Sequence, residues 1–364
     1  MTDSPLYVTR PFLPPLSELT PYLDSIWASR RLANDGPFHA ELESALCTHL
    51  GVSHLTLFSN GTLALMTALQ AARLTGEVLT SPFTFIATVN ALYWNRLRPV
   101  FVDIDPVTLG INPALIEAAI TPETSAILPV HVYGKPCDTD AIREIAALHN
   151  LKVIYDAAHT FGVKHQGRAL ASFGDMSALS FHATKVFNTF EGGAVVSRTA
   201  ELKARVDRLR NFGFKDATTE AIIEPGLNGK MDEFRAAVGL VQLKHMDWVM
   251  VQRERVRAAY AVMLPSNVTL VDSPNNSYLP VLFKQGEMYR NRAQAKLAEA
   301  GIYCRRYFGL VSGFPPYRNL PSANFNNLLV ARAVVQRVLC LPMYPELSDE
   351  DVERVCGELK KVVN

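Results

Sequence analysis

Residues 59–62 (Ser-Asn-Gly-Thr) separate an apolar run from a helical pattern in this chain of 364 residues. At such a junction, backbone N–H groups and the positive end of a helix can face a phosphate. An ordinary polar turn with an N-cap explains the same residues. The segment lacks GxGxxG, and no GKS or GKT follows it, so it is neither a dinucleotide fingerprint nor a Walker loop.

Asp156 ends another apolar run, residues 152–156. In open α/β sheets, ligands bind at the carboxyl edge of the strands. A carboxylate there loses hydration unless it meets a cation, so we expect a partner for Asp156. Capping of a turn is the alternative interpretation.

Lys185 follows the apolar run 176–181 and precedes Gly192 and Gly193. A lysine just beyond a buried strand can be desolvated, which makes its amine a nucleophile for carbonyl groups. The alternative is a surface lysine whose stem packs on apolar neighbours. For His182, a hydrogen-bonded core histidine is more common than a catalytic one.

These three features occur in the order phosphate site, acid at a strand end, and lysine at a strand end. Pyridoxal phosphate needs a phosphate cradle, a partner for its protonated pyridine nitrogen, and a lysine for a Schiff base. The combination therefore predicts a pyridoxal phosphate enzyme, although each feature alone has a structural explanation.

Short apolar runs alternate with helical patterns from residue 54 to about residue 198. The runs predicted as strands are residues 54–58, 77–81, 99–104, 126–132, 152–156, 176–181 and 193–197. The clearest helical patterns between them are residues 62–74 and 139–149. This alternation predicts an α/β domain with a mixed, mostly parallel sheet wrapped by helices.

The pattern changes in the last third of the chain. A polar, Gly-rich stretch at residues 213–228 precedes a long helical pattern at residues 232–263, which predicts a connection between two domains. Beyond it the predicted elements are strands at residues 277–283 and 338–341 and helices at residues 287–300 and 349–363. We predict a large α/β domain over residues 1–248 and a small α+β domain over residues 249–364.

The composition argues against several classes of protein. Lys and Arg number 36 against 35 Asp and Glu, so a broad nucleic-acid surface is not expected. No apolar stretch approaches the roughly 20 residues of a membrane helix, and residues 1–13 lack a signal-peptide pattern. The five cysteines are scattered without a CxxC pair, which predicts reduced thiols and no metal site. We expect a cytoplasmic protein that binds neither nucleic acid nor membrane.

Several longer motifs resemble those of one protein family. In chain order they are residues 82–88 (PFTFIAT), 101–104 (FVDI), 131–134 (HVYG), 156–159 (DAAH), 180–185 (SFHATK), 191–193 (EGG), 228–231 (NGKM) and 341–345 (LPMYP). They resemble the DegT/DnrJ/EryC1/StrS sugar-nucleotide aminotransferases from about residue 36 to the C-terminus. The resemblance implies a fold-type I enzyme that uses pyridoxal 5'-phosphate to move an amino group from L-glutamate to a nucleotide-linked keto sugar.

The resemblance also implies roles for single residues. Lys185 would form the Schiff base, and Asp156 would pair with the pyridine N–H. Phe85 would stack on the ring, and His159 would lie near its phenolic oxygen. The implied phosphate ligands are Gly61, Thr62, Ser180 and, from a neighbouring subunit, Asn228. The role of Asn228 implies a homodimer with shared active sites.

The residues that bind the substrate are less clearly indicated by the sequence. For the diphosphate of the sugar nucleotide, Lys230 and Arg305 or Arg306 are possible ligands, with solvated surface charges as the alternative. His131 and Tyr133 either line the sugar pocket or are core groups at a strand end.

Three segments look closest to family members that convert dTDP-4-keto-6-deoxyglucose to dTDP-4-amino-4,6-dideoxyglucose. They are residues 131–138, 185–191 and 228–234. The alternatives are C-3 amination of a dTDP-3-keto-6-deoxyhexose, a different pyridoxal phosphate reaction, and a non-catalytic nucleotide-sugar-binding relative. Some relatives carry histidine at the lysine position and dehydrate the sugar, so Lys185 favours amino transfer.

Overall fold

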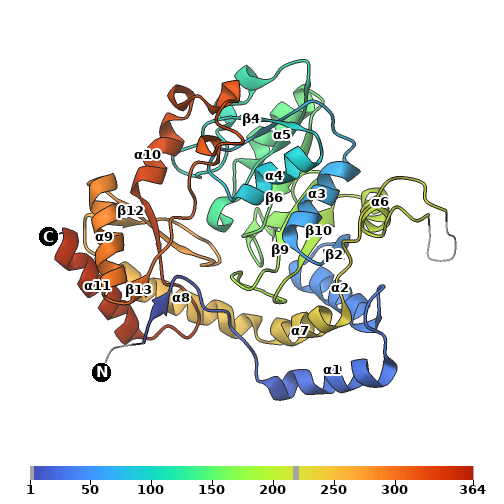
Figure 1. Cartoon of the computed structure of the whole chain (residues 1–364), viewed down its shortest axis with the longest axis horizontal. Helices are drawn as coiled ribbons and strands as arrows, with labels where there is room; N and C mark the ends of the chain where they lie inside the picture. The colour runs from blue at the N-terminus through green and yellow to red at the C-terminus, as the bar shows by residue number, and fades with distance from the viewer. Residues whose placement is uncertain (1–3, 216–220, 364) are drawn as a thin grey trace.

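A computed structural model describes residues 4–215 and 221–363, and its largest element is a seven-stranded mixed sheet (Figure 1). In spatial order the strands are β2 (Leu55–Phe58), β10 (Gly193–Ser197), β9 (Met176–Ser180), β6 (Lys152–Asp156), β5 (Thr124–Leu128), β3 (Glu77–Thr80) and β4 (Arg98–Phe101). Strand β10 is antiparallel to both neighbours, and the other adjacent pairs are parallel. The predicted mostly parallel α/β sheet is confirmed.

Helices cover both faces of this sheet. One face packs against α2 (Pro37–Leu50), α5 (Thr139–Leu148) and α7 (Glu233–Lys244), and the other against α3 (Gly61–Ala71), α4 (Ile86–Trp94) and α6 (Ala200–Arg210). When a sheet is covered on both faces, successive residues of its strands are apolar, whereas a half-exposed strand alternates apolar and polar residues. All four residues of β2, for example, are buried.

The helical pattern predicted over residues 232–263 forms two helices instead of one. Asp232 caps α7 by accepting a hydrogen bond from Arg235 N at 2.8 Å. Helix α7 ends at Lys244, and α8 (Met246–Met263) begins after His245. The break lets α7 follow the large sheet while α8 packs with the C-terminal elements.

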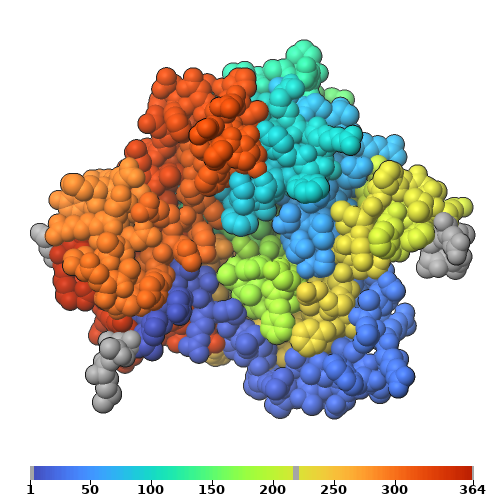
Figure 2. All heavy atoms as spheres, viewed as in Figure 1, coloured from blue at the N-terminus to red at the C-terminus, as the bar shows by residue number. Residues whose placement is uncertain are grey.

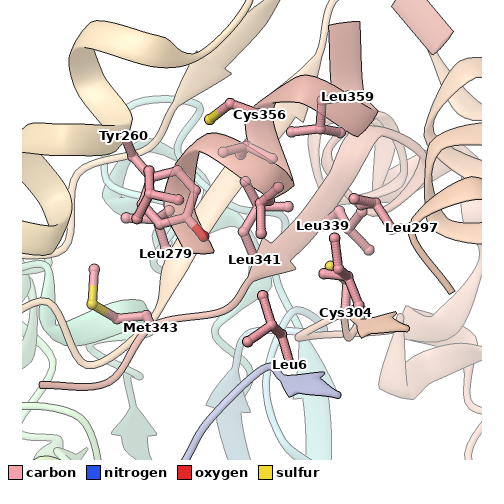
Figure 3. Close-up of a cluster of buried hydrophobic side chains, with 14 of the residues drawn as sticks. Leu6, Tyr260, Leu279, Leu297, Cys304, Leu339, Leu341, Met343, Cys356 and Leu359 are labelled. Carbon is pink, nitrogen blue, oxygen red and sulfur yellow. The ribbon is translucent and has the colours of Figure 1, made fainter. Parts of the chain in front are cut away.

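The C-terminal part is built on a three-stranded antiparallel sheet. Its elements are β11 (Val268–Leu270), β12 (Leu279–Phe283), β14 (Val338–Leu341), α9 (Glu287–Glu299), α10 (Leu329–Arg337) and α11 (Asp349–Val363). Figure 3 shows its core, in which Tyr260 of α8, Leu297 of α9 and Leu359 of α11 surround Leu341 of β14. A small α+β unit therefore follows the large sheet.

The first strand lies with this C-terminal part. Strand β1 (Leu6–Tyr7) pairs in parallel with β13 (Ile302–Tyr303), and Leu6 joins the core of Figure 3. Residues 6 and 7 therefore pack with the C-terminal part. The boundary at residue 248 stays a prediction, and α8 runs across it without a break.

One further helix and one short hairpin complete the α-helices and β-strands of the described residues. Helix α1 (Leu16–Ser29) packs beside α7 along the bottom of Figure 1, and β7 (Lys164–His165) and β8 (Arg168–Ala169) form a short hairpin. Residues 216–220 of the predicted connection lie outside the described residues. Among the helices that are described, none is long and apolar enough to cross a membrane.

Candidate active site

A cavity of about 600 Å³ opens where the parallel strands β2, β3, β6 and β9 have their carboxyl ends. Its lining includes Gly61, Thr62, Thr84, Phe85, Asp156, His159, Ser180, Lys185, Tyr278, Tyr307 and Phe308. Figure 2 shows N-terminal, central and C-terminal segments all reaching the middle of one face of the molecule. This edge of an open α/β sheet is the usual place for a ligand.

Asp156 lies on the floor of this cavity, 9% exposed, as the last residue of β6. Its Oδ2 accepts a hydrogen bond from Thr88 Oγ1 at 2.7 Å, and its Oδ1 accepts one from Ala158 N at 3.1 Å. Burial raises the pKa of Asp156, and the hydrogen bond from Thr88, that from Ala158 and the charge of Lys185 oppose the rise. The site therefore holds a carboxylate that is desolvated but provided with donors.

Lys185 stands in the loop after β9, where its backbone N–H closes a turn onto His182 O at 2.8 Å. Its Nζ donates to Tyr278 Oη at 3.1 Å. The Tyr278 side chain comes from the segment just before β12, in the C-terminal part. The amine is thus held between the two parts of the molecule, facing the cavity.

His159 is buried beside Lys185, and its ring lies parallel to that of Phe308 with centroids 5.6 Å apart. Burial, followed by the charge of Lys185, lowers the pKa of His159 well below its usual value. Its Nδ1 accepts a hydrogen bond from Tyr133 N at 3.1 Å. A neutral ring that accepts at Nδ1 carries its proton on Nε2, so His159 can donate at that atom.

The opposite end of the cavity is formed by the start of α3. Asn60 caps the helix by accepting from Leu63 N at 2.9 Å, and the free N–H groups of its first turn belong to Gly61 and Thr62. A Cβ on Gly61 would lie 2.8 Å from Ser180 Cβ, so a side chain at this position would crowd Ser180. Backbone N–H groups, two hydroxyls and a helix N-terminus thus converge where an anion can bind.

Comparison with known proteins agrees with this geometry. The sequence profile of the DegT/DnrJ/EryC1/StrS aminotransferase family matches residues 17–360. The chain belongs to this family. The enzyme resembles the dTDP-4-amino-4,6-dideoxy-D-glucose transaminase of Shigella dysenteriae, with 46% identity covering 99% of this chain and 100% of the relative.

Solved structures of aminotransferases share the fold. The crystal structure of DesI in the presence of its TDP-sugar product has a TM-score of 0.93 at 37% identity, covering 99% of this chain and 93% of DesI. That of NtdA from Bacillus subtilis with bound cofactor PMP has a TM-score of 0.86 at 28% identity, covering 100% of this chain and 87% of NtdA. This enzyme is a pyridoxal phosphate-dependent aminotransferase.

The cavity of the aminotransferase fits pyridoxal phosphate by the chemistry of its donors. The start of α3 offers N–H groups and hydroxyls for the phosphate, and Gly61 leaves the room that a Cβ would fill. Asp156 offers a buried acceptor for the pyridine N–H, and Lys185 offers an amine on the cavity wall. Phe85, 55% exposed, presents an aromatic face to the same space.

His131 and Tyr133 do not line the cavity of this aminotransferase. Both are fully buried. The His131 ring stacks on Tyr155 with centroids 4.4 Å apart, and its Nδ1 accepts from Cys137 N at 3.1 Å. The Tyr133 hydroxyl donates to Tyr307 O. Of the two interpretations that the sequence left open, the structure places both residues in the core.

The candidate cationic residues are also not among the residues that line the cavity. Lys230 Nζ donates to Asn211 Oδ1 at 2.7 Å and lies 4.7 Å from the centroid of the Phe212 ring. Arg305 and Arg306 are exposed, and Arg306 Nε donates to Gln294 Oε1 at 2.7 Å.

Asn228 is likewise not among the residues that line the cavity. Its segment runs beside the start of α3, where Ser59 N donates to Gly229 O at 2.8 Å.

Several cavity residues were not anticipated from the sequence. They are Thr84, Thr88 through its contact with Asp156, Tyr278, Tyr307 and Phe308. Tyr278 and its neighbours belong to the C-terminal part, and no local motif relates them to Lys185. His182, for which a core histidine was the more common expectation, is instead a half-exposed cavity residue whose Nε2 lies 3.6 Å from Glu191 Oε1.

Proposed function

We propose that this aminotransferase moves an amino group from L-glutamate to carbon 4 of dTDP-4-keto-6-deoxyglucose, giving dTDP-4-amino-4,6-dideoxyglucose. The observation that carries the proposal is the 46% identity, over nearly the whole of both chains, to a transaminase named for that amino sugar. The likeness to DesI, whose structure contains a TDP-sugar product, supports the same substrate class.

Lys185 is the residue that binds the cofactor covalently and moves the reacting proton. When bound, pyridoxal phosphate supplies an aldehyde that exchanges amines and a ring that accepts electrons. Lys185 Nζ would hold the cofactor and, once freed, would take the proton from the α-carbon of the amino donor. With the keto sugar it moves the proton in the opposite direction. Tyr278 orients the amine of Lys185, because Tyr278 Oη accepts a hydrogen bond from Lys185 Nζ at 3.1 Å.

Asp156 and His159 would each contact one polar atom of the pyridine ring of the cofactor. Asp156 accepts the pyridine N–H and, as a buried anion, keeps that nitrogen protonated. His159 would donate from Nε2 to the phenolic oxygen, and its burial keeps the imidazole neutral. Phe85, which lines the cavity, would pack against the face of the ring.

Gly61, Thr62 and Ser180 bind the phosphate, and Asn228 of a second subunit completes that site. The proposal of a shared site is supported by the position of Asn228, which lies outside the cavity of its own subunit although its segment runs beside α3. The enzyme is therefore a homodimer with two shared active sites.

An exposed apolar surface supports the homodimer. Leu13, Leu16, Trp27 and Leu32 are 58–73% exposed on and around α1. This helix forms the lower rim of the molecule in Figure 2 and packs beside α7, which begins shortly after Asn228. Clustered large apolar side chains at a surface mark interaction sites.

We also propose that the enzyme acts in the cytoplasm, and the state of its cysteines supports this. All five cysteines are free thiols, and burial raises the pKa of Cys137 to about 12 and that of Cys356 to about 11. Thiols of this kind suit a reducing compartment.

Two measurements test amino transfer itself. The purified enzyme should be yellow and should release 2-oxoglutarate from L-glutamate when a 4-keto sugar nucleotide is present. Lys185→Ala should abolish this release, because the amine that moves the proton is lost. Release at the normal rate from Lys185→Ala would overturn the role of Lys185. A wild-type protein that binds the sugar nucleotide but releases no 2-oxoglutarate would favour the non-catalytic alternative.

A further inference from the structure

Two threonine hydroxyls lead in series from the cavity wall to Asp156. Thr84 Oγ1 lies 2.7 Å from Thr88 Oγ1, and Thr88 Oγ1 donates to Asp156 Oδ2 at 2.7 Å. Thr84 lines the cavity, and both threonines are almost completely buried. Thr88 lies in the first turn of α4, and Thr84 directly precedes Phe85, the N-cap of that helix.

The chemistry of Asp156 fixes the direction of this series. An ionised carboxylate only accepts hydrogen bonds, so the Thr88 proton must point to Asp156. The oxygen of Thr88 then accepts from the Thr84 hydroxyl. Both dipoles consequently point toward the negative charge, and hydrogen bonds arranged in series strengthen one another in a low-dielectric site.

We propose that Thr84 and Thr88 are positioning residues that keep Asp156 ionised and fixed in orientation for an N–H donor. The proposal rests on the role of Asp156 in the proposed function. The other groups that face this carboxylate are the Ala158 N–H on Oδ1 and the Lys185 ammonium. When the cofactor is bound, its protonated pyridine nitrogen would be the cationic partner of Asp156, and the two hydroxyls would hold the carboxylate in place for it.

A set of substitutions separates this role from simple packing. Thr88→Val removes the hydroxyl and keeps the branched shape, whereas Thr88→Ser keeps the hydroxyl. Thr84→Val removes the outer hydroxyl alone. The matched control is Thr67→Val on α3, because Thr67 is 1% exposed and its hydroxyl has no hydrogen-bond partner among the described residues.

The first readout is the titration midpoint of Asp156 in the full-length protein freed of cofactor. It is followed by NMR of ¹³C-carboxyl-labelled aspartate, with Asp156→Asn identifying the signal. We expect Thr88→Val to raise the midpoint, Thr84→Val to raise it less, and Thr88→Ser and Thr67→Val to leave it near the wild-type value.

The second readout is the dissociation constant for pyridoxal phosphate. We expect about tenfold weaker binding to Thr88→Val and recovery in Thr88→Ser, as the loss of one hydrogen bond to a charged group implies. An unchanged midpoint in Thr88→Val, or an equal rise in Thr67→Val, would overturn the proposal.

If the Thr88→Val variant does not fold, the Thr84→Val variant provides the test. An unchanged titration midpoint of Asp156 in Thr84→Val would then overturn the proposal. Neither readout involves a sugar substrate. The result of these experiments is therefore independent of the test of amino transfer described above.

Discussion

Lys185 Nζ and Tyr278 Oη lie 3.1 Å apart, although the two side chains come from different parts of the molecule. Lys185 follows β9 of the large sheet, and Tyr278 precedes β12 of the C-terminal sheet. The Tyr278 ring is packed edge-on against His159, with centroids 5.1 Å apart. Orientation of the lysine therefore depends on how the C-terminal part docks on the large sheet.

Replacement of Tyr278 by Phe should slow both half-reactions about three- to tenfold without preventing cofactor binding. One hydrogen bond of roughly 0.5–1.5 kcal/mol is lost, while the ring contacts remain. Rapid-mixing kinetics with L-glutamate measures the effect. Tyr260→Phe is the control, since Tyr260 is a buried tyrosine of the C-terminal core whose hydroxyl has no partner among the described residues. Equal rates for wild type and Tyr278→Phe would show that the hydroxyl has no role.

Hybrid dimers test the shared active site. Neither Lys185→Ala nor Asn228→Asp homodimers should be active, because the first lacks the reacting amine and the second places a carboxylate beside the phosphate. After mixing and subunit exchange, each hybrid contains one site with both wild-type residues. About a quarter of the wild-type activity is expected if exchange is statistical, half the dimers being hybrids with one intact site each. Absence of any recovery, despite exchange verified by mass, would contradict sharing.

Asp103 should stabilise the contact between the large sheet and α10. Its Oδ2 accepts from Val330 N at 2.8 Å, and its Oδ1 accepts from Ala331 N at 2.9 Å. Asp103→Ala should lower the free energy of unfolding by about 1–2 kcal/mol, the usual effect of losing a helix cap. Urea titration measures it. Asp105→Ala, which removes an acceptor within a local turn, is the matched control and should cost less.

His131 should make the enzyme less stable in acid. Burial lowers its pKa from 6.5 to about 3 in the folded protein. Between these values the unfolded chain binds the proton and the folded chain does not, so stability is fully present above pH 6.5 and falls as the pH decreases toward 3. His131→Phe should reduce the slope of unfolding free energy against pH in this window. An unchanged slope would assign the acid sensitivity to other groups.

Local sequence patterns predicted the elements of the large sheet and two candidate site residues that line the cavity. Asp156 and Lys185 each follow an apolar run, and the carboxyl ends of parallel strands meet at one edge. Both therefore reach one cavity. The start of α3 was also predictable from a local pattern, because Asn60 and Gly61 come just after the apolar run of β2.

Residues that act through tertiary contacts were not predictable. Thr88 meets Asp156 across 68 positions of sequence, and Tyr278 meets Lys185 across 93, because sheet order and docking bring them together. The same holds for Leu6, which pairs with Ile302. The break at His245 was missed because periodicity continues through it while the packing surface changes.

The position of the new amino group tests the central claim most directly. The wild-type enzyme is incubated with L-glutamate and, in parallel reactions, with the 4-keto and the 3-keto isomer of the dTDP-linked 6-deoxy sugar, and NMR locates the nitrogen in each product. We predict amination of the 4-keto isomer, with nitrogen on carbon 4 as in dTDP-4-amino-4,6-dideoxyglucose. Amination of the 3-keto isomer alone would contradict the proposed substrate.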